Sequence, residues 1–378
     1  MSPFFDPDHL ALQARVRAWV ESSLLAGHDS GDLESRARLL VQQFGAAEFL
    51  KHTVAQEFGG ARKKVAARDL CILREESARG DALADTMFAL QALGSYPITL
   101  AGNDEQKRRY LPKVASGDAI AAFAITEPEA GSDVASLQTT AVRQGEQFIL
   151  SGIKRFISNA GIADFYVVFA STAPEKKAKG MSAFIVDANT PGLAVKEKTK
   201  VLSPHPIGVL EFIKCIVPRS ALLGAEGDGL KIALETLDLL RCSVGAAAVG
   251  FAQRALEEAI RYSKSRRQFG RAIGEFQGIQ FKLAEMATEL EAARLLVYQA
   301  AWAHDCGNAD VKQKSSMAKF YATEAAQRVV DQALQIHGGN GLIAGSIMER
   351  LYRDVRALRI YEGTSEIQKL VIARGLLK

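Results

Sequence analysis

The pattern of apolar residues changes twice along the chain, and this change constrains the fold more than any single motif. Up to about residue 119 the apolar residues recur at helical spacing. From Ala121 the apolar runs shorten to strand length, and turn signals such as Thr190-Pro191-Gly192 separate them. Helical spacing returns after Pro218. We therefore expect an α+β multidomain protein with an N-terminal α-helical domain (1–119), a central antiparallel β-domain (120–225) and a C-terminal helical domain (226–378).

The central segment contains short apolar runs joined by connections of hairpin length. Such a series predicts an antiparallel sheet or barrel. The expected strands lie at 123–125, 148–150, 165–169, 184–186, 193–195 and 209–216.

The clearest helical period lies in the last third of the chain. Steps of 4, 3, 4, 3 and 4 residues connect Ile279, Leu283, Met286, Leu290, Ala293 and Val297, as in the apolar seam of a bundle helix. Mainly helical segments at 227–265, 275–305, 310–337 and 345–375 predict a four-helix bundle. No Gly-x-Gly-x-x-Gly follows a predicted strand, which disfavours a nicotinamide-binding Rossmann unit.

Composition excludes several classes of function. The 378 residues are 48% hydrophobic and 24% charged, as in ordinary globular proteins of more than one domain. A net charge of +4 is too small to indicate a nucleic-acid partner. No apolar run approaches the ~20 residues of a membrane span, so membrane insertion is not expected.

The cysteines and the N-terminus bear on the compartment. Four cysteines lie far apart without metal-ligand spacing, which suggests buried free thiols in a reducing compartment. The N-terminus resembles neither a signal nor a transit peptide. We expect a cytoplasmic protein, although a processed mitochondrial-matrix protein would have the same properties.

Two polar stretches follow predicted strands. In Thr126–Asp133 the hydroxyls of Thr126 and Ser132 could hold the polar edge of a planar heterocycle. In Lys154–Gly161 the ring of Phe156 could stack on such a heterocycle, and Ser158 could reach a ring nitrogen. Core packing is an equally good interpretation of Phe156 by itself.

Two further stretches lie between predicted helices. Arg266 offers a planar donor fork that suits a pyrophosphate, although a basic surface corner is the commoner role of such a run. The glycines of Gln335–Gly341 could form an anion-binding nest, or Gly338 or Gly339 could end a helix.

The segment around Glu362 places a carboxylate on a short break between two helices. Gly363 allows a tight turn and a close approach of the backbone to a ligand. Ser365 and Gln368 have the spacing of a capping box. Considered alone, this segment also fits a helix–helix corner with a solvated glutamate.

Together, and in this order, these stretches resemble the acyl-CoA dehydrogenase family over essentially the whole chain. The matching signatures are Thr126-Glu127-Pro128-x-Ala130-Gly131-Ser132-Asp133, Arg266-x-Gln268-Phe269-Gly270, Gln335-x-x-Gly338-Gly339-x-Gly341 and Tyr361-Glu362-Gly363-Thr364. The resemblance implies flavin adenine dinucleotide (FAD) held between domains and a neighbouring subunit. It also implies a homotetramer built as a pair of dimers.

The resemblance implies a role for each matching position, with Glu362 as the catalytic base. Positions that match cofactor contacts are Phe123, Ile125, Thr126, Ser132, Phe156, Ser158, Arg266, Gln268, Phe269, Gln335, Gly338, Gly339, Thr364 and Glu366. Positions that match the surroundings of the substrate are Ser132, Arg241, Tyr361 and Gly363. The implied reaction converts an acyl-CoA thioester to the trans-2-enoyl-CoA, with hydride transfer to FAD and onward transfer of electrons to an electron-transfer flavoprotein.

The chain departs from the family pattern at several places. Phe156 and Ser158 stand where many members have tryptophan and threonine. Some members place their catalytic base directly before the arginine that corresponds to Arg241. Here that position is Leu240, which cannot accept a proton, and this supports Glu362 as the base. Segment 202–208 lacks the usual Gly-x-Arg-x-Ser pattern, and we interpret its His205 as part of a rigid exposed loop.

Three alternatives stay open at this level. The chain could be a flavin oxidase or monooxygenase of the same fold, a dehydrogenase of carrier-protein thioesters, or a non-catalytic flavin-binding module. The sequence does not specify the length, branching or ring content of the acyl chain.

Overall fold

The computed structural model describes residues 4–25 and 31–377, which form two compact units. The first unit contains the described parts of residues 1–28 and 238–378 together with 66–85. The second unit contains the described part of 29–65 together with 86–237. The three domain boundaries inferred from the sequence remain a prediction. Within the described ranges, no helix combines the length and apolar character needed to cross a membrane.

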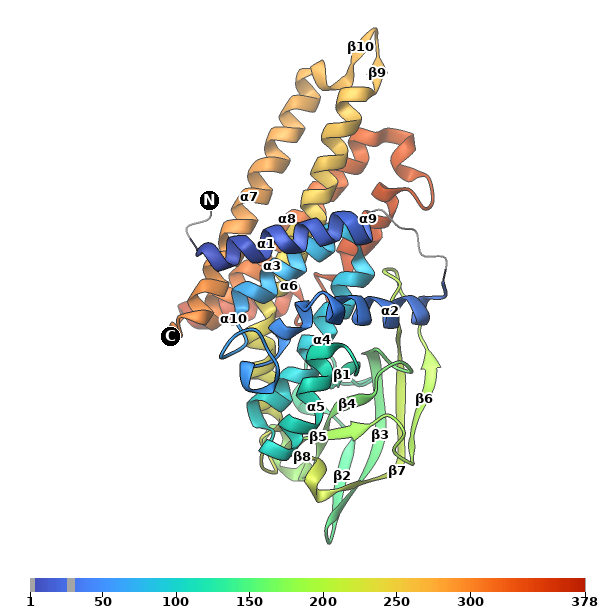
Figure 1. Cartoon of the computed structure of the whole chain (residues 1–378), viewed down its shortest axis with the longest axis vertical. Coiled ribbons are helices and arrows are strands. Elements are labelled where there is room, and N and C mark those ends of the chain that lie inside the picture. The colour runs from blue at the N-terminus through green and yellow to red at the C-terminus, as the bar shows by residue number, and fades with distance from the viewer. Residues whose placement is uncertain (1–3, 26–30, 378) are drawn as a thin grey trace. The chain divides into compact units, whose positions relative to one another are not determined.

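The second unit contains the sheet (Figure 1). All of the expected strands are present, and two more were missed: β2, which is short and polar, and β8, which has only two residues. The strands are β1 (Ala121–Ala124), β2 (Thr140–Gln144), β3 (Gln147–Ser158), β4 (Phe165–Ser171), β5 (Met181–Asp187), β6 (Leu193–Lys198), β7 (Ile207–Pro218) and β8 (Leu222–Leu223).

The strand order is β6-β7-β3-β2-β4-β5-β8, with β1 paired to β4. The sheet is mixed rather than wholly antiparallel, because β1 pairs with β4 in parallel. Strand β2 also pairs with β4 in parallel, through one residue pair. Every residue of β4 is buried, which explains its continuous apolar sequence.

The α-helices of the second unit are α2 (Leu33–Ala46), α4 (Ala82–Ala101, from residue 86 onward), α5 (Asp104–Ser116) and the part of α6 (Gly229–Ser265) up to residue 237. Leu111 and Val114 of α5 share a core with Phe123, Phe165 and Phe169 of the sheet. The buried amide of Gln91 on α4 donates to the carbonyl of Ala119 and accepts from the N–H of Ala121, both at 2.8 Å. This pair of hydrogen bonds fixes the start of β1.

The first unit is helical, and its last four segments follow the expected bundle pattern. Its helices are α1 (Pro7–Trp19), α3 (Ala67–Gly80), α6 (Gly229–Ser265, from residue 238 onward), α7 (Gln277–Asp305), α8 (Val311–His337), α9 (Ile347–Ala357) and α10 (Ser365–Leu376). The short hairpin of β9 (Arg267–Gln268) and β10 (Arg271–Ala272) joins α6 to α7 (Figure 1). In the predicted seam of α7, Met286, Leu290, Ala293 and Val297 are buried, whereas Ile279 and Leu283 are only half-buried.

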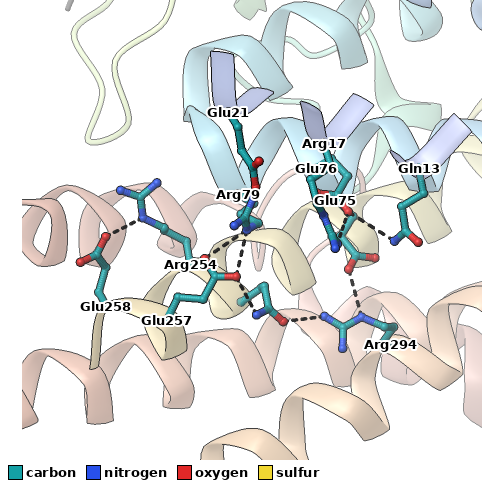
Figure 2. A network of polar contacts seen from close by, with 11 residues as sticks. Gln13, Arg17, Glu21, Glu75, Glu76, Arg79, Arg254, Glu257, Glu258 and Arg294 are labelled. Atoms are coloured by element: carbon teal, nitrogen blue, oxygen red, sulfur yellow. Dashed lines mark hydrogen bonds and ion pairs between the residues drawn. The ribbon is translucent and has the colours of Figure 1, made fainter. Parts of the chain in front are cut away.

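A buried polar network ties α3 to its neighbours (Figure 2). On one side, Glu76 accepts from Arg17 of α1 at 2.6 and 3.1 Å. On the other, Glu75 accepts from Arg294 at 3.0 Å and from the hydroxyl of Tyr298 at 2.7 Å, both on α7. Helix α6 packs closely here, since a Cβ at Gly250 would lie 2.1 Å from the carbonyl oxygen of Glu75.

The cysteines are free thiols in the structure. Cys71, Cys215 and Cys242 are buried as expected, but Cys306 is exposed. The expectation of burial was therefore wrong for Cys306, which lies just after the end of α7.

Candidate active site

The turn that carries Glu362 lies between α9 and α10, as the sequence predicts. Glu362 has a φ of 52° and Gly363 a φ of 89°, so both residues adopt the left-handed conformation. A side chain at Gly363 would also collide with Gln368, since a Cβ there would lie 2.5 Å from Nε2. For Glu362 this conformation costs about 1–2 kcal/mol, and such strain persists only where neighbouring groups hold it.

Two buried side chains hold this turn through its carbonyl groups. The Nζ of Lys319 on α8 donates to the carbonyl of Gly363 at 2.6 Å. The amide of Gln368 donates to the same carbonyl at 3.0 Å and to that of Glu362 at 3.3 Å. The strained backbone is thus fixed from two helices.

The predicted capping box at Ser365 is wrong. Thr364 is the N-cap of α10, because its hydroxyl accepts from the N–H of Ile367 at 3.3 Å. Ser365 lies one residue later and donates to Glu324 at 2.6 Å. Gln368 turns back to the carbonyls of Glu362 and Gly363, which is why its spacing looked like that of a capping residue.

The carboxylate of Glu362 lacks the partners that buried carboxylates normally have. Its Oε2 is buried, and neither a hydrogen bond nor an ion pair to the carboxylate occurs within residues 4–25 and 31–377. Burial raises the pKa of Glu362 above its ordinary value, whereas the charges of Arg74, Lys319 and Arg241 oppose the rise and Asp85 adds to it. Glu362 is therefore a carboxyl group whose proton affinity is increased and whose oxygen is free to react.

The nearby cations are engaged with other groups. Arg74 of α3 forms a bidentate ion pair with Asp85, at 2.9 Å for both contacts. Arg241 of α6 contacts Asp238 at 2.6 Å, and its Nε is buried without a partner. Burial lowers the pKa of Lys319 to about 8. Because these cations are held by other groups, they moderate the charge of Glu362 without forming an ion pair with it.

Tyr361 directly precedes Glu362. Burial raises the pKa of its hydroxyl, and the positive charge of Arg74 opposes this rise. The first unit thus brings together the predicted residues Glu362, Tyr361, Gly363 and Arg241.

Sequence reasoning missed Arg74, Asp85 and Lys319. All three side chains are buried, which is rare for a charged residue without a partner. Only Asp85 stands in a strongly apolar helical segment, and that position is the one available signal. Their pairing could not be read from the sequence, since Arg74, Lys319 and Glu362 lie far apart along the chain.

The second unit brings together the predicted residues at the ends of β1 and β3. The N–H of Arg155 donates to the carbonyl of Thr126 at 2.8 Å, and the Nζ of Lys154 donates to that of Ile125 at 3.1 Å. Lys154 is fully buried and also contacts the carboxylate of Glu127 at 2.7 Å. The same carboxylate accepts from the N–H of Thr139 at 3.0 Å, so it braces both ends of the loop that carries Ser132.

Phe156 is a surface residue and not part of the core. Its side chain is 49% exposed, and its φ of 56° coincides with an irregularity in the pairing of β3 with β7. The core interpretation applies instead to Phe123, whose buried ring lies 4.8 Å from that of Phe169. Ser158, the last residue of β3, is half-buried.

The polar groups beside Phe156 are available to a ligand. The hydroxyls of Thr126 and Ser132 form no hydrogen bond with any residue that the structure describes. An exposed aromatic ring, two free hydroxyls and Ser158 are a set of stacking and hydrogen-bonding groups that fits a flat heterocycle with polar edges.

The remaining predicted cofactor residues lie in the first unit. Phe269 is 94% exposed at the tip of the β9–β10 hairpin, next to Gln268 and close in sequence to the exposed Arg266. Gly338 ends α8, since its N–H donates to the carbonyl of Gln335, and nothing lies within 4 Å of a Cβ built at Gly338 or Gly339. Gly338 thus ends the helix, as one of the two interpretations expects, and the anion-binding role of the glycines stays a prediction. Glu366 is exposed in the first turn of α10.

Comparisons with known proteins agree over the whole chain. The models for the N-terminal, middle and C-terminal domains of acyl-CoA dehydrogenases match residues 6–118, 122–215 and 227–377. An acyl-CoA dehydrogenase of Bacillus subtilis is 44% identical over 341 residues, which are 89% of each chain. The chain belongs to the acyl-CoA dehydrogenase family.

Two other members bear on the chemistry. The chain is 39% identical to a subunit of the caffeyl-CoA reductase–Etf complex of Acetobacterium woodii, over 99% of this chain and all of that protein. An acyl-CoA dehydrogenase of Bacillus anthracis in complex with FAD has a TM-score of 0.91 and 31% identity, over all of this chain and 68% of that chain. The protein is accordingly an oxidoreductase of this family, and its cofactor is FAD.

Proposed function

We propose that the protein removes hydrogen from the α and β carbons of an acyl-CoA thioester to form the trans-2-enoyl-CoA, with Glu362 as the base. The buried and unpartnered Oε2 of Glu362 is the observation that carries this proposal. A paired carboxylate would be a weaker base. Burial moves the pKa of Glu362 toward working pH, where a base is most effective.

The chain provides the groups that bind, orient and deprotonate the substrate. Glu362 takes the proton from the α-carbon, and its backbone N–H stabilises the charge that develops on the thioester oxygen. FAD supplies the acceptor for the hydride of the β-carbon, and Phe156, Ser158 and Thr126 would hold its ring. Arg241 and Ser132 would contact the acyl-CoA. Because Glu362 works only when ionised, the rate should rise as the pH rises through its elevated pKa.

Replacing the base by its amide tests the proposal. In Glu362→Gln we expect bound yellow flavin and unchanged ligand binding, but flavin reduction slowed at least ~10³-fold, about 4 kcal/mol of barrier. Anaerobic stopped-flow bleaching with acyl-CoA measures this rate. Glu57→Gln, at an exposed glutamate outside the site, is the matched control. Near-normal reduction in Glu362→Gln would remove the proposed base.

Reduction of an enoyl-CoA is a second candidate, because one relative is named as a caffeyl-CoA reductase subunit. Glu362 would then deliver a proton to the α-carbon, and its raised pKa suits this role as well. Single-turnover rates with acyl-CoA and oxidised enzyme, and with enoyl-CoA and reduced enzyme, separate the two directions. A panel of short, medium, branched and aromatic thioesters, on CoA and on a carrier protein, would define the substrate.

For electron transfer and assembly, we propose an electron-transfer flavoprotein as the acceptor and a homotetramer formed by two dimers. The printed name of the Acetobacterium relative includes Etf, which supports the first proposal. Exposed apolar side chains at Phe269, Leu342 and Ile343 support the homotetramer.

Two measurements test these proposals. Rapid reaction of the reduced enzyme with oxygen would point to an oxidase instead of electron transfer to a flavoprotein, and mass photometry would give the oligomeric state. We also propose a cytoplasmic location.

A further inference from the structure

His205 lies against the end of β3. The N–H of Asn159 donates to the carbonyl of Pro206 at 2.8 Å, and Ser158 pairs with Ile207 in the register of β3 and β7. The Nε2 of His205 lies 3.1 Å from the Oγ of Ser158. The interpretation of His205 as part of an exposed loop was therefore wrong, because its ring is half-buried and contacts a predicted flavin residue.

The other ring nitrogen determines which partner donates. The Nδ1 of His205 lies 3.0 Å from the carbonyl oxygen of Ser203. A carbonyl oxygen only accepts hydrogen bonds, so Nδ1 carries a proton. Burial lowers the pKa of His205, which favours the neutral ring. In a neutral ring with a proton on Nδ1, Nε2 is an acceptor, and Ser158 must donate its only hydroxyl proton to it.

We propose that His205 is a positioning residue that holds the hydroxyl proton of Ser158 and so presents the Ser158 oxygen to the flavin ring as an acceptor. The inference rests on the proposed function, in which Ser158 contacts the flavin. Pro204 and Pro206 restrict the backbone on both sides of His205, and this restriction keeps the imidazole in place.

A Ser158 oxygen that can only accept a hydrogen bond from the flavin favours one redox state of the cofactor. A flavin ring nitrogen that carries hydrogen after reduction is a donor and can bond to the Ser158 oxygen. The same nitrogen in the oxidised ring is an acceptor and would face an oxygen that has no proton to give. His205 therefore stabilises the reduced flavin relative to the oxidised flavin, and it promotes the transfer of hydride to the ring.

The flavin midpoint potential without substrate tests this effect. In His205→Phe the hydroxyl of Ser158 is free to rotate, so the relative stability of the reduced form should fall roughly tenfold, a drop of about 30 mV for a two-electron couple. Ser158→Ala should also lower the potential, and the double variant should fall no further than Ser158→Ala alone. His304→Phe, at another half-buried histidine that lies outside the predicted site, should leave the potential unchanged.

The proton position can be read in the unmodified protein, with or without flavin. Nitrogen-15 NMR of histidine-labelled protein, assigned with His205→Phe, should show the Nδ1–H tautomer of His205. The Nε2–H tautomer, or additive shifts in potential for the two single variants, would overturn the proposal. If these results contradict the inference while Glu362→Gln still slows reduction, the proposed function stands without it. If Glu362→Gln reduces normally while the potentials shift as expected, the proposed base fails and the role of His205 stands.

Discussion

Two carboxylate sites in the first unit, each with buried oxygens, differ in whether those oxygens have hydrogen-bond partners. On α3, Glu75 and Glu76 have hydrogen-bond donors on all four oxygens, from Gln13, Arg17, Arg294 and Tyr298. Glu362 has a buried oxygen with no partner, although three cations lie in its surroundings. Burial raises the pKa of both Glu76 and Glu362, so a raised pKa alone does not separate them. The presence or absence of hydrogen-bond partners separates them, as is expected if Glu75 and Glu76 are structural and Glu362 has the proposed catalytic role.

The difference has a physical basis in the cations. Around Glu76, Arg17 reaches across from α1 and bonds directly to the carboxylate. Around Glu362, Arg74 is held by Asp85 and Lys319 by a backbone carbonyl. A protein that keeps a carboxylate unpaired loses stability there, and such sites are commonly functional.

Breaking the paired site should have the largest effect on stability. In Glu75→Ala, Arg294 and Tyr298 lose a common acceptor, and we expect the free energy of unfolding to fall by about 3 kcal/mol. The rate of flavin reduction per folded molecule should not change. Urea unfolding followed by circular dichroism measures the first quantity and stopped-flow bleaching the second. Slower reduction at unchanged stability would reverse the assignment of the two sites.

Removing the lysine that holds the Glu362 turn should affect the proposed reaction more than the fold. In Lys319→Met the carbonyl of Gly363 loses its charged donor, and the turn that carries Glu362 loosens. We expect reduction roughly tenfold slower. Since Lys319 also lowers the pKa of Glu362, the pH profile should move to higher pH. Lys314→Met on the same helix, where Lys314 pairs with Asp310, is the control. Equal rates and profiles in both variants would exclude a role for Lys319 in catalysis.

The smallest effect is expected at the edge of the α3 network. Glu21 is 53% exposed and contacts Arg79 at 3.4 Å, and Arg79 keeps Glu257 as a second partner (Figure 2). Glu21→Ala should therefore change the free energy of unfolding by less than about 0.5 kcal/mol. If Glu21→Ala lowered the free energy of unfolding as much as Glu75→Ala, solvent exposure would not determine how much an ion pair in this network contributes to stability.

Local sequence patterns predicted the elements better than their pairing. Hydrophobic spacing located α6 to α8 and the break at Glu362, because those features depend on neighbouring residues. It missed the parallel pairing of β1 with β4, which depends on residues about 40 positions apart. The short polar β2 gave no strand signal, although β3 and β4 hold it in the sheet.

The candidate site shows the same limit. Motifs selected Glu362, Phe156 and Ser158, but they did not show that Phe156 is exposed or that Lys319 holds the turn. His205 was underrated because its contact with Ser158 depends on how the 199–206 loop closes against β3. Side-chain pairing across the fold is a tertiary property, and neither spacing nor composition specifies it.

The central claim is that Glu362 has a buried carboxylate oxygen with no hydrogen-bond or ion-pair partner. The most direct test is to titrate this group by infrared difference spectroscopy, with the flavin-bound protein compared with Glu362→Gln. We predict that the carboxyl band specific to Glu362 titrates above pH 4.5, the ordinary value for glutamate. A midpoint at or below 4.5, as expected for an ion-paired carboxylate, would contradict the account.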